Sequence, residues 1–179
     1  MKRSTDWKIA VNGIAPVMVA LLSASAAFGQ FAATGTTTLS VTVAAEAAIQ
    51  VNTATTTLTS GSTIFGASFT GTTSLTFKIR TTKTTGTGTI TVANTAFQAN
   101  GPTLAVTTFT CTAASGTPCS GSQTASTSAV TVVSFSASAN GAHSATAGDA
   151  ASVAWTIPDD PQYQTGTYTS TATFTISAT

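Results

Sequence analysis

The chain has 179 residues, of which 42% are hydrophobic and only 6% are charged, and its formal net charge is +1. Setting aside the N-terminal segment described next leaves three cations and four carboxylates, a balance of −1: Lys78, Arg80, Lys83, Glu46, Asp149, Asp159 and Asp160. This composition argues against nucleic acid and acidic lipid as partners, because neither meets a basic surface. Low net charge instead favours association between protein copies.

The first 29 residues have the pattern of a secretory signal peptide. A basic start precedes an uncharged stretch with a dense apolar run at residues 14–22, and small residues follow, with alternative cuts after Ala27 and Gly29. A membrane anchor is the alternative, but the run is shorter than the ~20 apolar residues that a spanning helix needs. We therefore expect residues 1–29 to be removed. The mature chain would be secreted, extracellular or at the cell surface, with no membrane span.

Residues 39–51 alternate with a two-residue period, which is typical of a half-buried β-strand. The odd positions are apolar or alanine: Leu39, Val41, Val43, Ala45, Ala47, Ile49 and Val51. The run is about twice as long as the usual strand of about 5–6 residues. Two interpretations stay open: the strand bends and passes from one sheet to the other, or its first half pairs with another molecule. In the second case Leu39, Val41 and Val43 form an assembly strand.

We accordingly assign residues 30–52 to a long N-terminal strand, which combines a candidate donor strand with the first strand of a sandwich, and residues 53–179 to a β-sandwich domain. Apolar alternation indicates further short strands near residues 75–80, 90–92, 104–109, 130–135, 153–157 and 168–178. Stretches of small residues at 111–131 and 136–147 are expected to be loops. About 150 mature residues suffice for one core.

The predicted fold class is all-β, a single immunoglobulin-like β-sandwich of about 7–9 antiparallel strands. In the last strand, threonine and serine alternate with residues of the opposite face, which include Phe174 and Ile176. We expect Phe77, Trp155 and Phe174 to contribute to the core.

The two cysteines, Cys111 and Cys119, are separated by seven small or polar residues. In an exported chain they should form a disulfide, because the compartment is oxidising. With such short spacing we expect it to staple a local turn rather than to join distant strands. A redox or metal pair is the alternative, but zinc needs four ligands and the chain has only 1 His.

The sequence predicts no catalytic residues. The only histidine, His143, lies near Ser144 and Asp149, but a triad is defined by geometry in a pocket, and this segment is rich in small residues, where an exposed histidine is the ordinary outcome. Patterns for a nucleophile elbow, a zinc protease or a phosphate loop are absent from the sequence.

Other charged residues have ordinary structural interpretations. Asp159 and Asp160 lie between two prolines, where we expect them to cap a turn. Calcium is the alternative there, although it takes six or more oxygen ligands. Lys78 and Arg80 share one face of a strand, with Lys83 close behind, and we interpret them as a solvated sheet edge that resists mispairing. We predict neither a metal nor a cofactor.

The ending TGTYTSTATFTI, residues 165–176, resembles the close of secreted bacterial fimbrial subunits of the spore coat U and chaperone-usher kind. In that family a Gly-x-Tyr or Gly-x-Phe step leads into a final alternating strand. The resemblance implies that the mature N-terminus is an alternating strand that completes the incomplete sandwich of a neighbouring subunit. Residues 36–43 occupy the matching place.

We therefore expect a non-enzymatic structural subunit of an extracellular or cell-surface polymer, similar to a pilus or filament, that assembles as a homo-polymer by strand addition through the N-terminal strand. The alternative is a monomeric secreted immunoglobulin-like adhesion or binding module. Its loops would carry recognition, and its long first strand would cross between the sheets. A secreted hydrolase is a third, weaker hypothesis.

Overall fold

The computed structural model describes residues 34–113, 117–137 and 141–179 and divides the chain into two units, residues 1–41 and 42–179. The predicted signal peptide therefore lies outside the described residues. In the first unit, residues 34–41 are exposed and have no regular secondary structure. All strands of the structure belong to the second unit.

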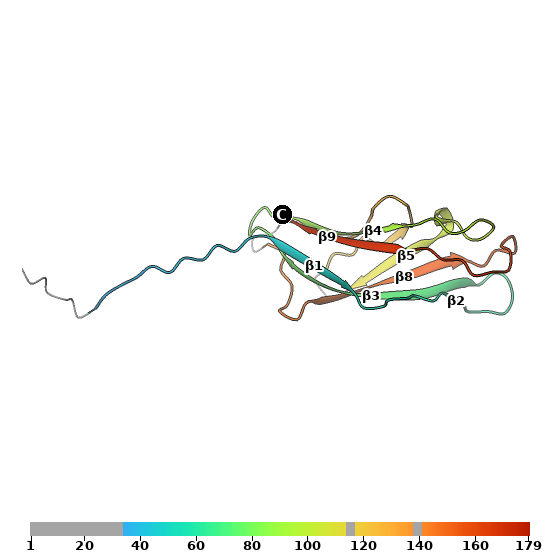
Figure 1. Cartoon of the computed structure of the whole chain (residues 1–179), viewed down its shortest axis with the longest axis horizontal. Helices are drawn as coiled ribbons and strands as arrows, with labels where there is room; N and C mark the ends of the chain where they lie inside the picture. The colour runs from blue at the N-terminus through green and yellow to red at the C-terminus, as the bar shows by residue number, and fades with distance from the viewer. Residues whose placement is uncertain (1–33, 114–116, 138–140) are drawn as a thin grey trace, which may run out of the picture. The chain divides into compact units, whose positions relative to one another are not determined.

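The second unit is a β-sandwich of two antiparallel sheets (Figure 1). Its elements are β1 (Glu46–Val51), β2 (Thr59–Ser60), β3 (Ser68–Arg80), β4 (Gly88–Asn94), the 3₁₀ helix η3 (Leu104–Val106), β5 (Thr108–Ala113), β6 (Ser122–Thr124), β7 (Val130–Phe135), β8 (Asp149–Pro158) and β9 (Ala172–Ala178). The six-stranded sheet has the order β1-β3-β8-β5-β6, with β2 also paired to β3, and the three-stranded sheet has the order β7-β4-β9. The predicted all-β class is thus confirmed.

The core is built from every second side chain of the long strands, as two-residue alternation requires. In β3 and β8 the buried positions are Thr73, Leu75, Phe77, Ile79, Ala151, Val153, Trp155 and Ile157. Phe77 packs against Phe135 of the other sheet with ring centroids 5.6 Å apart, and Phe109 packs against Trp155 at 5.3 Å. The prediction that Phe77 and Trp155 lie in the core is confirmed, whereas Phe174 is only half-buried.

The long strand predicted over residues 39–51 is shorter in the structure. Only residues 46–51 form a strand, and residues 39–45 have no regular secondary structure. The physical reason is the register with β3: Glu46 lies opposite Arg80, where β3 ends, so the residues before Glu46 have no strand opposite them. The prediction of one continuous strand was therefore wrong for residues 39–45 within a single copy.

The strand predicted to end the chain begins later than expected, at Ala172 rather than at Tyr168. The Tyr168 hydroxyl donates to the carbonyl oxygens of Gln164, at 2.8 Å, and Asn100, at 3.1 Å. Its ring lies directly against the bare Cα of Gly101, where any Cβ would collide with it. Strand β4 ends at Asn94, opposite Ala172, so its pairing with β9 stops there, and Tyr168 lies in the segment before the strand.

Two other local predictions were wrong in part. The strand predicted at residues 104–109 begins only at Thr108, because residues 104–106 form the 3₁₀ helix η3. The loop predicted at residues 111–131 contains the end of β5, all of β6 and the start of β7. Both segments lack a clear apolar alternation of their own, and pairing with neighbouring strands decides their conformation.

Cys111 and Cys119 form a disulfide, as predicted, with their Cα atoms 5.5 Å apart. The expectation that it staples only a local turn was wrong. Cys111 belongs to β5 of the six-stranded sheet, whereas Cys119 forms an isolated antiparallel bridge with Val133 of β7 in the other sheet. The disulfide therefore links the two layers of the sandwich.

Replacing both cysteines with alanine should lower the free energy of unfolding by about 2–3 kcal/mol, because the closed loop is short and the cross-link restricts the unfolded chain. Urea denaturation followed by circular dichroism measures this loss. Thr112→Ala, at an exposed neighbouring position of β5, is the matched control and should unfold like the parent. An unchanged midpoint in the double variant would contradict the expectation.

Candidate functional site

The two sheets end side by side in the strands β1 and β9, which are edges of the six-stranded and the three-stranded sheet, respectively (Figure 1). The other edge of the three-stranded sheet, at β7, is covered by residues 118–120. Ser120 N donates to Val132 O at 2.9 Å, and Ser134 N donates to Pro118 O at 3.2 Å. In the described part of the chain, the outer edge of β9 has no such covering strand.

Burial falls off toward this open side. In β4, Ile90 and Val92 are fully buried, at 0% exposure, whereas Phe174 and Ile176 of the neighbouring β9 are half-buried. Ile49, which faces the same interior from β1, is also half-buried. The core is therefore incompletely covered between β1 and β9.

Strand β9 carries none of the features that usually protect a sheet edge. It is seven residues long, with the sequence ATFTISA, and contains neither a charge nor a proline. Exposed edges of this kind are templates for pairing with a further strand, because a row of backbone N–H and C=O groups is available. The edge of β9 is thus the main candidate for an interaction site of the sandwich.

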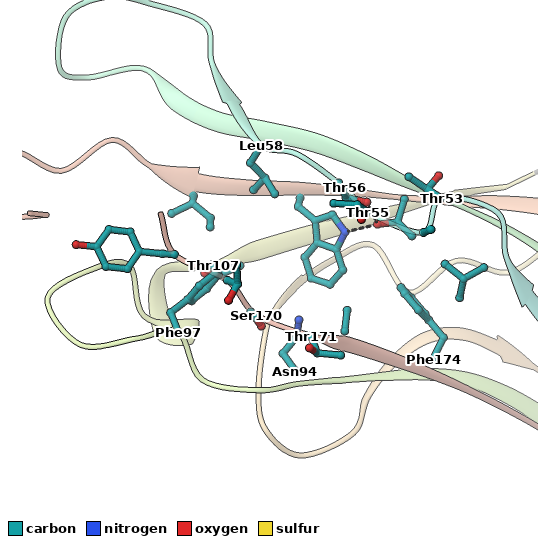
Figure 2. Close-up of a pocket in the computed structure, with 18 residues that line it drawn as sticks. Thr53, Thr55, Thr56, Leu58, Asn94, Phe97, Thr107, Ser170, Thr171 and Phe174 are labelled. Atoms are coloured by element: carbon teal, nitrogen blue, oxygen red, sulfur yellow. Dashed lines mark hydrogen bonds between the residues drawn. The ribbon is translucent and has the colours of Figure 1, made fainter. Parts of the chain in front are cut away.

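A cavity of about 350 Å³ lies where the open side reaches the end of β1. Its walls include Val51, Leu58, Phe97, Trp155, Tyr168 and Phe174. Figure 2 shows Leu58 and Phe97 on opposite walls, one from the segment after β1 and the other from the segment after β4. Among the residues that the structure describes, no charged side chain lines the cavity. A neutral, largely apolar guest is therefore the kind that it would accommodate.

Most polar groups of the cavity wall are already paired. Trp155 Nε1 donates to Thr73 Oγ1 at 2.9 Å, and the hydroxyls of Thr73 and Thr56 are hydrogen-bonded at 2.6 Å. Asn94, at the end of β4, differs from these groups, because its buried Oδ1 has no hydrogen-bond partner among the described residues. An unpaired buried acceptor is destabilising by about 1–3 kcal/mol. The buried polar groups of the described core are therefore less completely hydrogen-bonded at this end of the sandwich than elsewhere.

The predicted assembly residues lie before β1. Leu39, Val41 and Val43 are 92%, 85% and 60% exposed, respectively, and none of them belongs to a strand. Three alternating apolar side chains at such exposure are unusual, because isolated apolar residues are common on protein surfaces but contiguous ones mark interaction sites.

The structure does not assemble a triad from the residues near His143. The Ser144 hydroxyl accepts a hydrogen bond from Ile79 N at 3.0 Å, and Asp149 Oδ1 accepts one from Ala145 N at 3.3 Å. The side chains of Ser144 and Asp149 thus bind backbone groups. His143 is exposed, and its backbone forms an isolated antiparallel β-bridge with Arg80.

Some of the other charged residues have structural roles. Asp160 Oδ1 caps a turn by accepting from Gln162 N at 2.8 Å, as expected for this proline-flanked segment. Partial burial raises the pKa of Tyr163, and the charges of Asp160 and then of Asp159 raise it further. Arg80 and Glu46 form an exposed ion pair at 2.8 Å, a type that contributes little to stability. Among the described residues, no three His, Cys, Asp or Glu side chains gather in a way that would hold a metal.

Comparison of the chain with family models, curated proteins and solved structures gave no match. In the described part of the chain, no helix is long and apolar enough to cross a membrane.

Sequence reasoning missed the edge of β9 and the cavity. The alternation of residues 172–178 indicates a strand, but it does not reveal which strands lie beside it. The apolar pair Ile64 and Phe65, 74% and 67% exposed, was also missed. The sequence did contain a sign of this exposed pair, since these two bulky residues lie within a run of mostly glycine, serine and threonine.

Proposed function

We propose that this protein is a non-enzymatic structural subunit of an extracellular polymer that assembles by strand addition. Residues 36–43 of one copy would pair with the open edge of β9 in the next copy. The observation that carries the proposal is the combination, in one chain, of an unprotected edge over a half-covered core and an exposed alternating segment that has no strand opposite it.

The dimensions of the two elements agree. Strand β9 has 7 residues, and the segment 36–43 is of similar length, with apolar alternation over residues 39–43. Strand addition satisfies the free backbone groups of the edge and places every second side chain on the core. Leu39, Val41 and Val43 would then cover the half-buried Phe174 and Ile176, and each buried side chain would contribute about 1.5–3 kcal/mol.

The cavity supports the same proposal. It adjoins Ala172 and Phe174, at the start of β9, and it is lined mainly by apolar and neutral side chains. An added strand that passes along β9 would reach this space and would place apolar side chains there. The apolar part of the cavity would be filled by the assembly itself.

The wider properties of the chain are compatible with this role. A surface with few charges favours association between copies. The disulfide fits an oxidising compartment, and we propose secretion on this basis together with the signal-peptide pattern of residues 1–29.

The proposal is tested with the exported chain and with a truncated chain that begins at Glu46. Size exclusion and electron microscopy over a range of concentrations should reveal polymers of the exported chain only. The truncated chain keeps all nine strands of the sandwich and should remain a folded monomer by circular dichroism. An exported chain that stays monomeric at high concentration, with residues 36–43 protected from hydrogen exchange, would contradict the proposal.

The alternative function, a monomeric adhesion or binding module, is favoured by one observation. Ile64 and Phe65 are exposed in the segment that connects β2 to β3, in a place where a recognition loop could present them. Hydrogen-exchange protection of residues 36–43 in a monomeric chain would favour this alternative, with that loop as the recognition surface.

A further inference from the structure

The two ends of the sandwich differ in what they present. At one end, which we call the cavity end, Val51 and Ile157 line the cavity and the segment 61–67 connects β2 to β3. At the other end, which we call the tail end, β1 begins at Glu46 opposite Arg80, and the segment 81–87 leads from β3 to β4. Strand β1 therefore begins at the end opposite to the cavity.

The cavity end presents an apolar pair. Ile64 and Phe65 are 74% and 67% exposed. Their segment is held by local hydrogen bonds, since Ser62 O accepts from the Ser60 hydroxyl at 2.9 Å and Ser62 Oγ accepts from Ile64 N at 3.2 Å. Gly66 follows with a φ of 105°, which side chains rarely tolerate. The two apolar side chains thus project from a turn whose conformation is fixed by local hydrogen bonds.

Charge is divided between the same two ends. Asp159 and Asp160 lie at the cavity end, where Asp159 N donates to Ala67 O at 3.0 Å. The described cations lie toward the tail end: Lys78, Arg80 and Lys83. Glu46 and Asp149 are there as well, so cations exceed carboxylates at the tail end, while the described residues at the cavity end include two carboxylates and no cation.

We infer that the cavity end of one copy docks on the tail end of the next copy, with Ile64 and Phe65 packed beside the emerging segment near Val43 and with Asp159 and Asp160 facing Lys83. This inference rests on the proposed strand addition and adds a second contact to each junction. Val43 is 60% exposed and is the last alternating apolar side chain before the alanines that precede β1, so it offers the apolar surface that the pair needs.

The arrangement defines the direction of assembly. A segment that leaves the tail end of one copy and enters the cavity end of the next runs antiparallel to β9, which runs from the cavity end to the tail end. Because the two docking surfaces are different, the contact is head-to-tail. Such contacts produce open chains of subunits rather than closed two-fold dimers, unless the rotation between copies happens to close a ring.

A second copy fits this surface better than a lipid bilayer does. Anionic membranes attract basic segments, whereas the apolar pair is flanked by Asp159 and Asp160. Opposite charges across an interface orient the partners and speed their encounter, and the effect falls off beyond a screening length of ~8 Å at physiological salt. The charges therefore act only where the two ends meet.

The apolar contact is tested with the double variant Ile64→Ser/Phe65→Ser in the full exported chain. Both side chains are exposed in the single copy, so the melting temperature should stay that of the parent. The lowest concentration at which polymers pellet should rise about tenfold, a typical effect of removing a buried apolar anchor from an interface. Thr63→Ala, in the same turn, is the matched control and should assemble like the parent. An unchanged threshold in the double variant would overturn the inference.

The charge contact is tested by reversal. Asp159→Lys and Lys83→Asp should each raise the assembly threshold, and the two together should restore it, because the pair is then reversed rather than broken. Additive losses in the combined variant would overturn the pairing. Binding of the parent to phosphatidylcholine vesicles that the double serine variant loses, with assembly unchanged, would assign the apolar pair to a membrane and overturn the inference as well.

The failure of this inference and that of the proposed function can be distinguished. If Val41→Asp stops assembly while the double serine variant and the charge variants assemble normally, strand addition stands and the end contact fails. If polymers survive Val41→Asp but are weakened by the double serine variant, the end contact stands and strand addition fails. A parent that never polymerises contradicts both.

Discussion

Replacing Val41 with aspartate should abolish polymer formation and leave the sandwich folded. In a single copy Val41 is 85% exposed, so a charge there is hydrated and the melting temperature should not change. In an assembled pair the same side chain would enter the interior beside β9. A buried charge without a partner is destabilising by several kcal/mol, which is comparable to what the apolar side chains of the added strand contribute.

The matched control is Thr42→Asp. Thr42 is also exposed in the single copy, but alternation directs it to the outer face of an added strand. The Thr42→Asp variant should therefore assemble, with at most a modest rise in the protein concentration at which polymers form. Electron microscopy and sedimentation of both variants beside the parent decide the matter.

Three results would contradict this expectation. Equal assembly of the Val41 and Thr42 variants would mean that the segment does not enter a core, whereas loss of assembly in Thr42→Asp alone would mean that the register is shifted by one residue. A lower melting temperature of Val41→Asp in dilute monomer would mean that the segment already packs within its own copy.

Replacing Phe77 with alanine should destabilise the sandwich by about 3–5 kcal/mol, the usual range for a buried phenylalanine. Phe77 is 1% exposed, and its ring packs against that of Phe135 across the two sheets. The loss thus combines a cavity in the core with the loss of an aromatic pair between the layers. Because the free energy of unfolding of a domain is only about 5–15 kcal/mol, this loss is a large fraction of the total stability.

The control for this variant is Thr72→Ala on the same strand. Thr72 is exposed on the outer face of β3, and such surface changes stay within about ±0.5 kcal/mol. Thermal melts and urea titrations of the two purified variants measure the difference. Similar midpoints for both would mean that the inward face of β3 has been assigned to the wrong residues.

The alternation of the sequence was sufficient to predict the class of fold and the inward face of several strands. Phe77 and Trp155 were assigned correctly because the two-residue period of a strand is a local property. The disulfide between Cys111 and Cys119 was also predictable, since an exported chain with two close cysteines offers few alternatives. Secretion itself stays a prediction.

The edges of the sheets were not predictable from the sequence. Residues 39–45 alternate as regularly as residues 46–51, yet only the latter are opposite β3, which ends at Arg80. Phe174 alternates like Phe77, yet it is half-buried because, among the described strands, β9 is paired with β4 alone. In the same way, the disulfide turned out to link two sheets.

The sequence by itself thus determined which side chains face inward along several of the strands, β3 and β8 among them, because that choice depends on neighbours one or two residues away. Only the tertiary structure decided which strand ends a sheet, where the core stays half-covered and where the cavity lies. These features depend on pairing between strands that are far apart in the chain, such as β4 with β9 and β3 with β8. A local pattern carries no information about such pairing, and the proposed assembly site is of this non-local kind.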